Sequence, residues 1–299
     1  MTLLITGASG KLGRRTAELV LERDDRPELI LVTRSPDAIA DLGDRGATVR
    51  FGDFADPASL PAAFAGTDRM LLISTHDVGE ERVAQHRAAI DAAREVGVRQ
   101  VVFTSFINPT AANPAGVIPD YRATEDLLAA SGLEWTFLRN AGYAEFQIPD
   151  GEPDRFPEGK LALDTGVLRN NTGDGKVAYV SREDCAAVAA AVLSEGAKHA
   201  GRAYDITGPE LIGGSELAEL YARISGRPVT RQAVSDAQYI EGLVAGGMPE
   251  FIAGFLASFG AATRLGALGV LSTTVADLTG RPATTMSAVL EAALTPAAV

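Results

Sequence analysis

The chain has 299 residues, and its 27 Lys and Arg residues stand against 39 Asp and Glu residues, which gives a formal net charge of −12. Hydrophobic residues make up 46% and charged residues 22% of the chain, so bulk disorder is excluded. The acidic balance argues against a nucleic-acid or anionic-membrane partner, because both require clusters of Lys and Arg. A phosphate-containing ligand would need a local positive site built by a few groups.

Cysteine and histidine usage excludes two further kinds of site. A single cysteine, Cys185, cannot form an internal disulfide and favours a reducing compartment, so we expect a cytoplasmic protein. The three histidines lie far apart without ligand spacing, which predicts no metal site. The first residues lack the features of a signal peptide, and Arg264 interrupts the apolar stretch 251–271, so no membrane span is expected.

Short apolar runs alternate with helical patterns through the first half of the chain. In chain order, the sequence predicts a strand over 3–5, a helix over 12–21, a strand over 29–32, a short helix over 36–42 and a strand over 47–51. It then predicts a helix over 57–64, a strand over 70–73, a helix over 80–96, a strand over 101–104, a helix over 120–130 and a strand over 135–138. This alternation indicates βαβ units, and continuous apolar strands indicate a sheet covered on both faces. The predicted fold class is α/β, a Rossmann-type doubly wound parallel sheet.

The pattern changes after Asn140. The later elements are predicted as an exposed proline-rich loop over 148–160, a helix over 181–193 opened by a capping box at Ser181, a strand over 204–206, a helix capped by Ser215 that ends at Gly226, and a strand from Val229. The sequence thus predicts a Rossmann domain over 1–150. A smaller C-terminal α/β substrate domain over 151–299 follows, some of whose elements can return to the main sheet.

A glycine-rich loop follows the first predicted strand. Its residues, spaced G-x-x-G-x-x-G, are Gly7, Ala8, Ser9, Gly10, Lys11, Leu12 and Gly13. Between a strand and a helix, such glycines let backbone N–H groups approach a pyrophosphate, and the helix N-terminus adds partial positive charge. We therefore predict a dinucleotide at this loop.

The end of the second strand indicates which dinucleotide binds. An NAD site usually has an acidic residue about 20 residues past the loop, but this strand ends at Thr33 and Arg34. A guanidinium there suits a 2′-phosphate, so NADP(H) is the predicted cofactor of the first domain. After the third strand, Asp53 and Phe54 are placed to contact an adenine, although Asp53 is equally consistent with an ordinary turn.

An ordered set of motifs resembles a known family. The motifs are the glycine loop, Arg34, Gly52-Asp53-Phe54, Leu72-Ile73-Ser74, Gln85-His86, Thr124-Glu125, Leu138-Arg139-Asn140-Ala141-Gly142-Tyr143, Gly173-Asp174-Gly175-Lys176 and Gly280-Arg281-Pro282-Ala283-Thr284-Thr285. Together they resemble the NmrA-like atypical short-chain dehydrogenase/reductases, nearest the bacterial type 2 NAD(P)H:quinone oxidoreductases and triphenylmethane reductases.

The resemblance implies NADPH across the carboxyl edge of the sheet and an acceptor in the interdomain cleft. It places Gly7 to Leu12 at the pyrophosphate, Arg34 at the 2′-phosphate, and Asn140 to Glu145 by the nicotinamide. The other expected cofactor contacts are Ser74, Thr75 and His76 after the fourth strand, Thr104 and Ser105 at the end of the fifth, and Asn140, Ala141, Gly142 and Tyr143 after the sixth.

The candidate catalytic residues are Tyr121, Asn140 and Tyr143. Ordinary short-chain dehydrogenases pair a serine with Tyr-x-x-x-Lys, in which the tyrosine passes a proton to the substrate. Here Ser105 is suitably placed, but Glu125 stands where the lysine belongs. This disfavours alcohol or ketone chemistry and favours a quinone, whose reduced form can take its proton from solvent.

Phe106, Tyr143 and Phe146 are candidates for an apolar wall against a flat acceptor, or for core packing. The predicted activity is thus NADPH-dependent reduction of a quinone or a similar conjugated acceptor. Two alternatives stay open: a non-catalytic NADP(H)-sensing regulator, as the family resemblance allows, and a reductase of a dye, azo compound or enone. The prediction allows a homodimer.

Overall fold

The computed structural model describes residues 1–25, 27–148 and 158–294, and it contains a seven-stranded parallel sheet in the order β3-β2-β1-β4-β5-β6-β9. The strands are β1 (Thr2–Ile5), β2 (Glu28–Thr33), β3 (Thr48–Phe51), β4 (Arg69–Leu72), β5 (Gln100–Phe106), β6 (Glu134–Asn140) and β9 (Arg202–Ile206). The strand order reverses direction between β1 and β4, which is where ligands bind in sheets of this kind.

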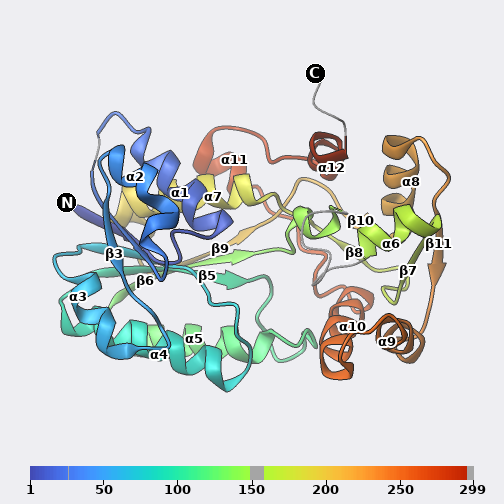
Figure 1. The fold of residues 1–299 in the computed structure, drawn as a ribbon, viewed down its shortest axis with the longest axis horizontal. Helices are drawn as coiled ribbons and strands as arrows, with labels where there is room; N and C mark the ends of the chain where they lie inside the picture. Colours follow the sequence, from blue (N-terminus) through green and yellow to red (C-terminus); the bar gives the residue numbers. More distant parts are fainter. Residues whose placement is uncertain (26, 149–157, 295–299) are drawn as a thin grey trace.

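Helices cover both faces of this sheet (Figure 1). One face carries α1 (Lys11–Leu21), α2 (Ala40–Asp44), α7 (Arg182–Glu195) and α11 (Thr274–Thr279), and the other carries α3 (Leu60–Phe64), α4 (Glu80–Glu95) and α5 (Ile118–Ala130). Short 3-10 turns η1 (Pro36–Ile39) and η2 (Pro57–Ser59) precede α2 and α3. The doubly wound α/β fold predicted from the sequence is confirmed.

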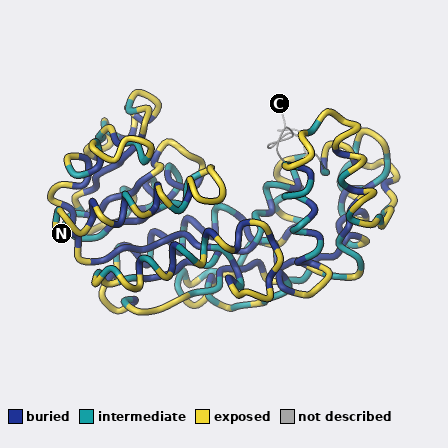
Figure 2. The backbone as a smooth tube through the Cα atoms, turned by 90° about the horizontal axis from the view of Figure 1, so that it is seen from below, coloured by how far each residue is buried: buried dark blue, intermediate teal, exposed yellow. Residues whose placement is uncertain are grey.

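The strands alternate their side chains between two apolar cores. In β1, Leu3 and Ile5 pack under α1 and α7, whereas Leu4 packs over α3 and α4. Both faces are apolar because both are covered, and Figure 2 shows the buried trace concentrated along the strands.

The rest of the chain forms a second region beside the carboxyl edge of the sheet (Figure 1). Its elements are η3 (Ala144–Gln147), α6 (Glu158–Thr165), β7 (Val167–Asn170), β8 (Lys176–Val177), β10 (Ile212–Gly213), α8 (Gly214–Ser225), β11 (Thr230–Ala233), α9 (Asp236–Ala245), α10 (Glu250–Arg264) and α12 (Met286–Leu294). Here β7 pairs in parallel with β11, and β8 pairs antiparallel with β10.

Later elements return to the main sheet: β9 joins it as a strand, and α7 and α11 lie on one of its faces. After η4 (Gly196–His199), β9 pairs in parallel with β6, and α7 packs beside α1. The predicted domain boundary at residue 150 lies outside the described residues, as does most of the loop predicted over 148–160; residues 158–160 begin α6.

One predicted helix start is wrong. Helix α8 begins at Gly214 with Gly213 as its N-cap, and Ser215 lies inside the first turn. A Cβ on Gly214 would lie 2.4 Å from the Arg231 side chain, so only glycine fits at the first residue of this helix. None of the helices in the described part of the chain is both long and apolar enough to span a membrane.

Candidate functional site

The predicted cofactor-binding residues lie at or just after the ends of strands β1 to β6, and the predicted catalytic residue Tyr121 lies in α5. Because the strands are parallel, their carboxyl ends meet at one edge of the sheet. The structure thus brings the glycine loop, Arg34, Asp53, and the residues after β4, β5 and β6 to the same edge. Their roles toward a ligand stay predictions.

The glycine loop is a tight cradle against the start of α1. Gly7 has a φ of +60°, a conformation that favours glycine, and its carbonyl accepts the Gly10 N–H at 2.9 Å. A Cβ on Gly13 would lie 2.4 Å from the Gly7 carbonyl oxygen, so only glycine lets the helix pack on the loop. Helix α1 has neither a capping side chain nor an acidic residue in its first turn, which leaves its N-terminal N–H groups for an anion.

Arg34 stands exposed beyond the end of β2. No carboxylate in the described ranges forms an ion pair with it, whereas Arg14 on α1 is held by Glu18 and Asp41. Behind it, the Thr33 hydroxyl accepts the Ser35 N–H at 3.0 Å and lies 2.8 Å from the Ser9 hydroxyl. The end of β2 is therefore fixed to the glycine loop, and Arg34 is the cation left available beside it.

Asp53 closes a turn after β3. Its Oδ1 accepts the Ala55 N–H at 3.0 Å, and its own N–H donates to Ser59 at 3.0 Å. Phe54 is partly buried against the core under α3. The turn carboxylate is one of the two interpretations given by the sequence, and adenine contact stays a prediction.

The loop after β4 is fixed by buried polar groups. The Ser74 N–H donates to Thr104 Oγ1 at 2.9 Å, and the Thr75 N–H donates to His86 Nε2 at 3.1 Å. Burial, with a smaller contribution from the Arg82 charge, lowers the pKa of His86 to about 3, so its imidazole is neutral. Its Nδ1 therefore carries the proton and donates to Thr124 at 2.9 Å. His86 orients the loop, while His76 is exposed.

Tyr121 lies on α5, near the loop after β4. Its hydroxyl is 3.2 Å from the Ser74 hydroxyl, and its ring stacks on Phe106 with centroids 5.9 Å apart. Phe106 in turn meets Phe259 of α10 edge-on at 6.0 Å. An aromatic surface thus runs from the sheet edge to the second region.

Ser105, Glu125 and Arg139 form a separate hydrogen-bonded group. The buried Ser105 hydroxyl donates to Glu125 Oε1 at 2.6 Å, and Arg139 donates to both carboxylate oxygens at 3.0 and 2.7 Å. The carboxylate at the position of the usual lysine is therefore paired with Arg139.

The loop after β6 presents Asn140 and Tyr143. The Asn140 Nδ2 donates to the Tyr143 hydroxyl at 3.2 Å, while its buried Oδ1 has no partner within the described structure. Burial raises the pKa of the Tyr143 phenol, so this group is a neutral donor. The loop is held by a bond from the Ala141 N–H to the Ile206 carbonyl at 2.9 Å.

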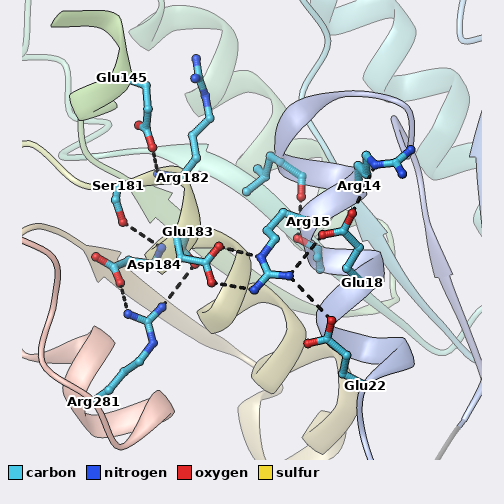
Figure 3. Close-up of polar contacts among 12 residues, drawn as sticks. Arg14, Arg15, Glu18, Glu22, Glu145, Ser181, Arg182, Glu183, Asp184 and Arg281 are labelled. Carbon is cyan, nitrogen blue, oxygen red and sulfur yellow. Dashed lines mark hydrogen bonds and ion pairs between the residues drawn. The ribbon is translucent and has the colours of Figure 1, made fainter. Parts of the chain in front are cut away.

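Helix α7 fixes the far side of this loop (Figure 3). Its first N–H, from Arg182, donates to Glu145 Oε1 at 2.8 Å, and Ser181 caps it through the Asp184 N–H. The predicted capping box is only half formed, because the Asp184 carboxylate instead accepts from Arg281 and from the Thr284 N–H. The late Gly280–Thr285 motif is thereby tied to the loop after β6.

Sequence reasoning missed the side chains that helices bring to the edge, chiefly Arg82 on α4 and Phe259 on α10. Arg82 is 5% exposed and lies on the same helix face as Gln85, His86 and Ala89. The available signal was the spacing: Arg82 and these three buried residues stand at i, i+3, i+4 and i+7, which is one face of a helix.

The cofactor prediction fits these residues. The cradle that a Cβ on Gly13 would fill, the uncapped helix start and the orphaned Asn140 oxygen are all features that a dinucleotide would use. Among the described residues, no group of three or more His, Cys, Asp or Glu side chains could hold a metal ion.

Comparisons with known proteins agree with this geometry. The model of the NAD(P)H-binding family matches residues 7–196. Quinone oxidoreductase 2 of Escherichia coli is 35% identical over 285 residues, covering 95% of this chain and 96% of that protein. The structure of the E. coli NADPH-dependent quinone oxidoreductase complexed with NADPH has a TM-score of 0.89 at 34% identity, covering 97% of this chain and 99% of that one.

A solved structure of Citrobacter sp. triphenylmethane reductase complexed with NADP(H) has a TM-score of 0.85 at 28% identity and covers 98% of this chain and 100% of that one. The resemblance predicted from the motifs is confirmed. With a family match over more than half of its length, the chain belongs to the NAD(P)H-binding family and is an NAD(P)H-dependent oxidoreductase of the quinone reductase type.

Proposed function

We propose that this protein reduces a quinone with NADPH, and that the quinone binds on the aromatic surface formed by Tyr121, Phe106 and Phe259. The observation that carries the proposal is the closed pairing of Ser105 with Glu125 at 2.6 Å, with Arg139 completing it. The Ser105 hydroxyl is used in this pairing, and Glu125, which stands where the lysine belongs, is its partner. The chain therefore lacks the usual means to protonate an alkoxide, and a quinone does not require it.

The chain's own groups suit NADPH as the cofactor. The glycine loop and the start of α1 would hold the pyrophosphate, Arg34 the 2′-phosphate, and Asn140 Oδ1 an amide N–H of the nicotinamide. When bound, NADPH supplies the hydride. The quinone gains that hydride and one proton from solvent to become the hydroquinone, so electrons and protons balance without an acidic residue.

The acceptor side of the edge favours a flat aromatic molecule. Tyr121 stacks on Phe106, and Phe259 meets Phe106 edge-on, which is the geometry that binds a further ring well. Phe255 extends the row, 5.4 Å from Phe259. Phe255 and Phe259 are partly buried, so part of each ring still faces solvent. The residues around Ser105 hold the sheet edge rigid while the rings position the acceptor.

NADPH oxidation against panels of quinones, triphenylmethane dyes, azo compounds, enones and simple ketones tests this proposal. We expect turnover with quinones and none with ketones. Turnover only with a dye or an azo compound would move the substrate class, and cofactor binding without any turnover would favour a regulatory protein.

Phe259 tests the position of the acceptor. Phe259→Ala should raise KM for the quinone by about fivefold, because an aromatic contact contributes about 1 kcal/mol beyond its area, and leave KM for NADPH unchanged. Phe251→Ala is the matched control, since that ring lies on the same helix but is 74% exposed. An equal effect of the two changes on quinone KM would exclude this surface.

A further inference from the structure

Arg82 is a buried charge that has no role in the reaction as proposed. It lies on α4 and is 5% exposed. Its guanidinium carbon lies 5.1 Å from the centre of the Tyr121 ring, a cation–π distance. Its Nη1 lies 3.4 Å from Asp120 Oδ2, and within the described structure its Nε and Nη1 have no hydrogen-bond partner. A guanidinium so poorly satisfied is costly to bury, which calls for a compensating role.

The partner carboxylate only partly compensates the charge. Asp120 Oδ2 also accepts the Gly79 N–H at 2.7 Å, at the turn that leads from the β4 loop into α4. The neighbouring imidazole of His86 is neutral because burial and then the Arg82 charge lower its pKa to about 3. The Tyr121 ring is a second group that the Arg82 guanidinium contacts.

Tyr121 is held between this cation and the site. Its hydroxyl lies 3.2 Å from Ser74, and its ring stacks on Phe106. In the ordinary pattern, a lysine four residues after the tyrosine supplies a positive charge beside it. Here that position holds Glu125, which is bound to Ser105 and Arg139. The positive charge beside the tyrosine comes instead from another helix.

We propose that Arg82 is a positioning residue of the reductase, which holds the Tyr121 ring and hydroxyl at the acceptor side of the sheet edge and places a positive charge against that ring. The inference rests on the proposed function. It adds to that function a means of stabilising charge. The negative oxygen that develops on the reduced quinone would lie next to the oriented Tyr121 phenol, with the Arg82 cation against its ring.

The test compares Arg82→Met with Arg82→Lys, and takes Arg87→Met as the matched control. Arg87 lies on the same helix, carries the same charge and is exposed. With 1,4-benzoquinone as the acceptor, Arg82→Met should lower kcat by about tenfold with KM for NADPH unchanged, and Arg82→Lys should restore much of the loss. Arg87→Met should match the wild type. Equal kcat in the Arg82→Met and Arg87→Met variants, or no rescue by lysine, would overturn the proposal.

A double-mutant cycle with Tyr121→Phe separates positioning from simple structural damage. If Arg82 acts through Tyr121, the two losses in kcat should be strongly non-additive; independent, multiplying losses would overturn the proposal. If Arg82→Met does not fold, the same cycle with Arg82→Gln, which also removes the charge, decides by the same criterion. Turnover by the wild type and by Arg87→Met tests the proposed function separately, so its failure is distinguishable from a failure at Arg82.

Discussion

The two halves of the sheet edge use polar groups in opposite ways. Beyond β1 and β2, the helix start is uncapped and Arg34 is exposed and unpaired within the described ranges. Beyond β4 to β6, the polar side chains are mostly buried and bound to one another, as in the pairs of Glu125 with Arg139 and His86 with Thr124. The first half keeps its donors for a ligand that brings its own charge. The second half is ordered in advance, as expected where the geometry of a reaction matters.

The largest effect is expected from breaking a pair in the ordered half. Arg139→Met would leave the Glu125 carboxylate buried without its partner, and should lower the free energy of unfolding by about 3 kcal/mol. Arg15→Met is the control: it also breaks a two-bond pair, with Glu183, but those side chains are 35% and 45% exposed, so about 0.5 kcal/mol is expected. Urea unfolding of both variants measures the contrast, and similar losses would erase the distinction between the halves.

Gly13→Ala probes the open half. Alanine would favour the helix by about 1 kcal/mol, but its Cβ at 2.4 Å from the Gly7 carbonyl forces a shift that costs about 2–3 kcal/mol. We expect NADPH affinity, measured by fluorescence titration, to fall by more than tenfold. Gly254→Ala in α10 is the matched control, because a Cβ added at Gly254 would have no atom within 4 Å. This variant should be as stable as the wild type or more stable. Unchanged NADPH affinity in the Gly13→Ala variant would contradict the prediction that the glycine loop binds the cofactor.

His86 gives the ordered half a pH dependence. Its pKa falls from 6.5 to about 3 on folding, first through burial and second through the Arg82 charge, so between these values the unfolded chain binds a proton that the folded one does not. Stability contributed by the neutral imidazole is complete above pH 6.5 and decreases as the pH falls, by about 2 kcal/mol at pH 5. His86→Gln should remove this part of the acid sensitivity, as thermal unfolding at pH 7 and pH 5 would show. The exposed His76→Gln should keep it, and equal profiles for the two variants would refute the assignment.

The smallest expected change is the most specific for the open half. Arg34→Ala should weaken NADPH binding by about tenfold, since one exposed charge-assisted contact contributes about 1.5 kcal/mol, and should not alter NADH binding. Arg45→Ala is the control. In a chain with a net charge of −12, it separates a specific contact from the loss of one positive charge. A parallel loss for NADH would show that Arg34 does not recognise the 2′-phosphate.

The sequence made the open half predictable and left much of the ordered half hidden. The glycine loop and Arg34 lie directly after a strand, a position that the local sequence pattern indicates. Arg82 and Phe259 reach the edge from helices, and only tertiary packing decides what a helix face contacts. Ser215 failed as a helix cap for the same reason, because the crowding of Gly214 by Arg231 arises between distant segments.

The return of β9 to the main sheet bears on how this chain can be divided. The chain leaves the sheet after β6, and comes back as α7 and β9 before it leaves again. A fragment truncated after β6 would lose the strand that pairs with Thr136 to Asn140, and would expose a seven-residue edge with unpaired backbone donors and acceptors. Such edges pair with other chains, so excision of the first domain would give an aggregation-prone product. Chimeras that exchange segments of the second region should therefore keep α7 and β9 with the first half.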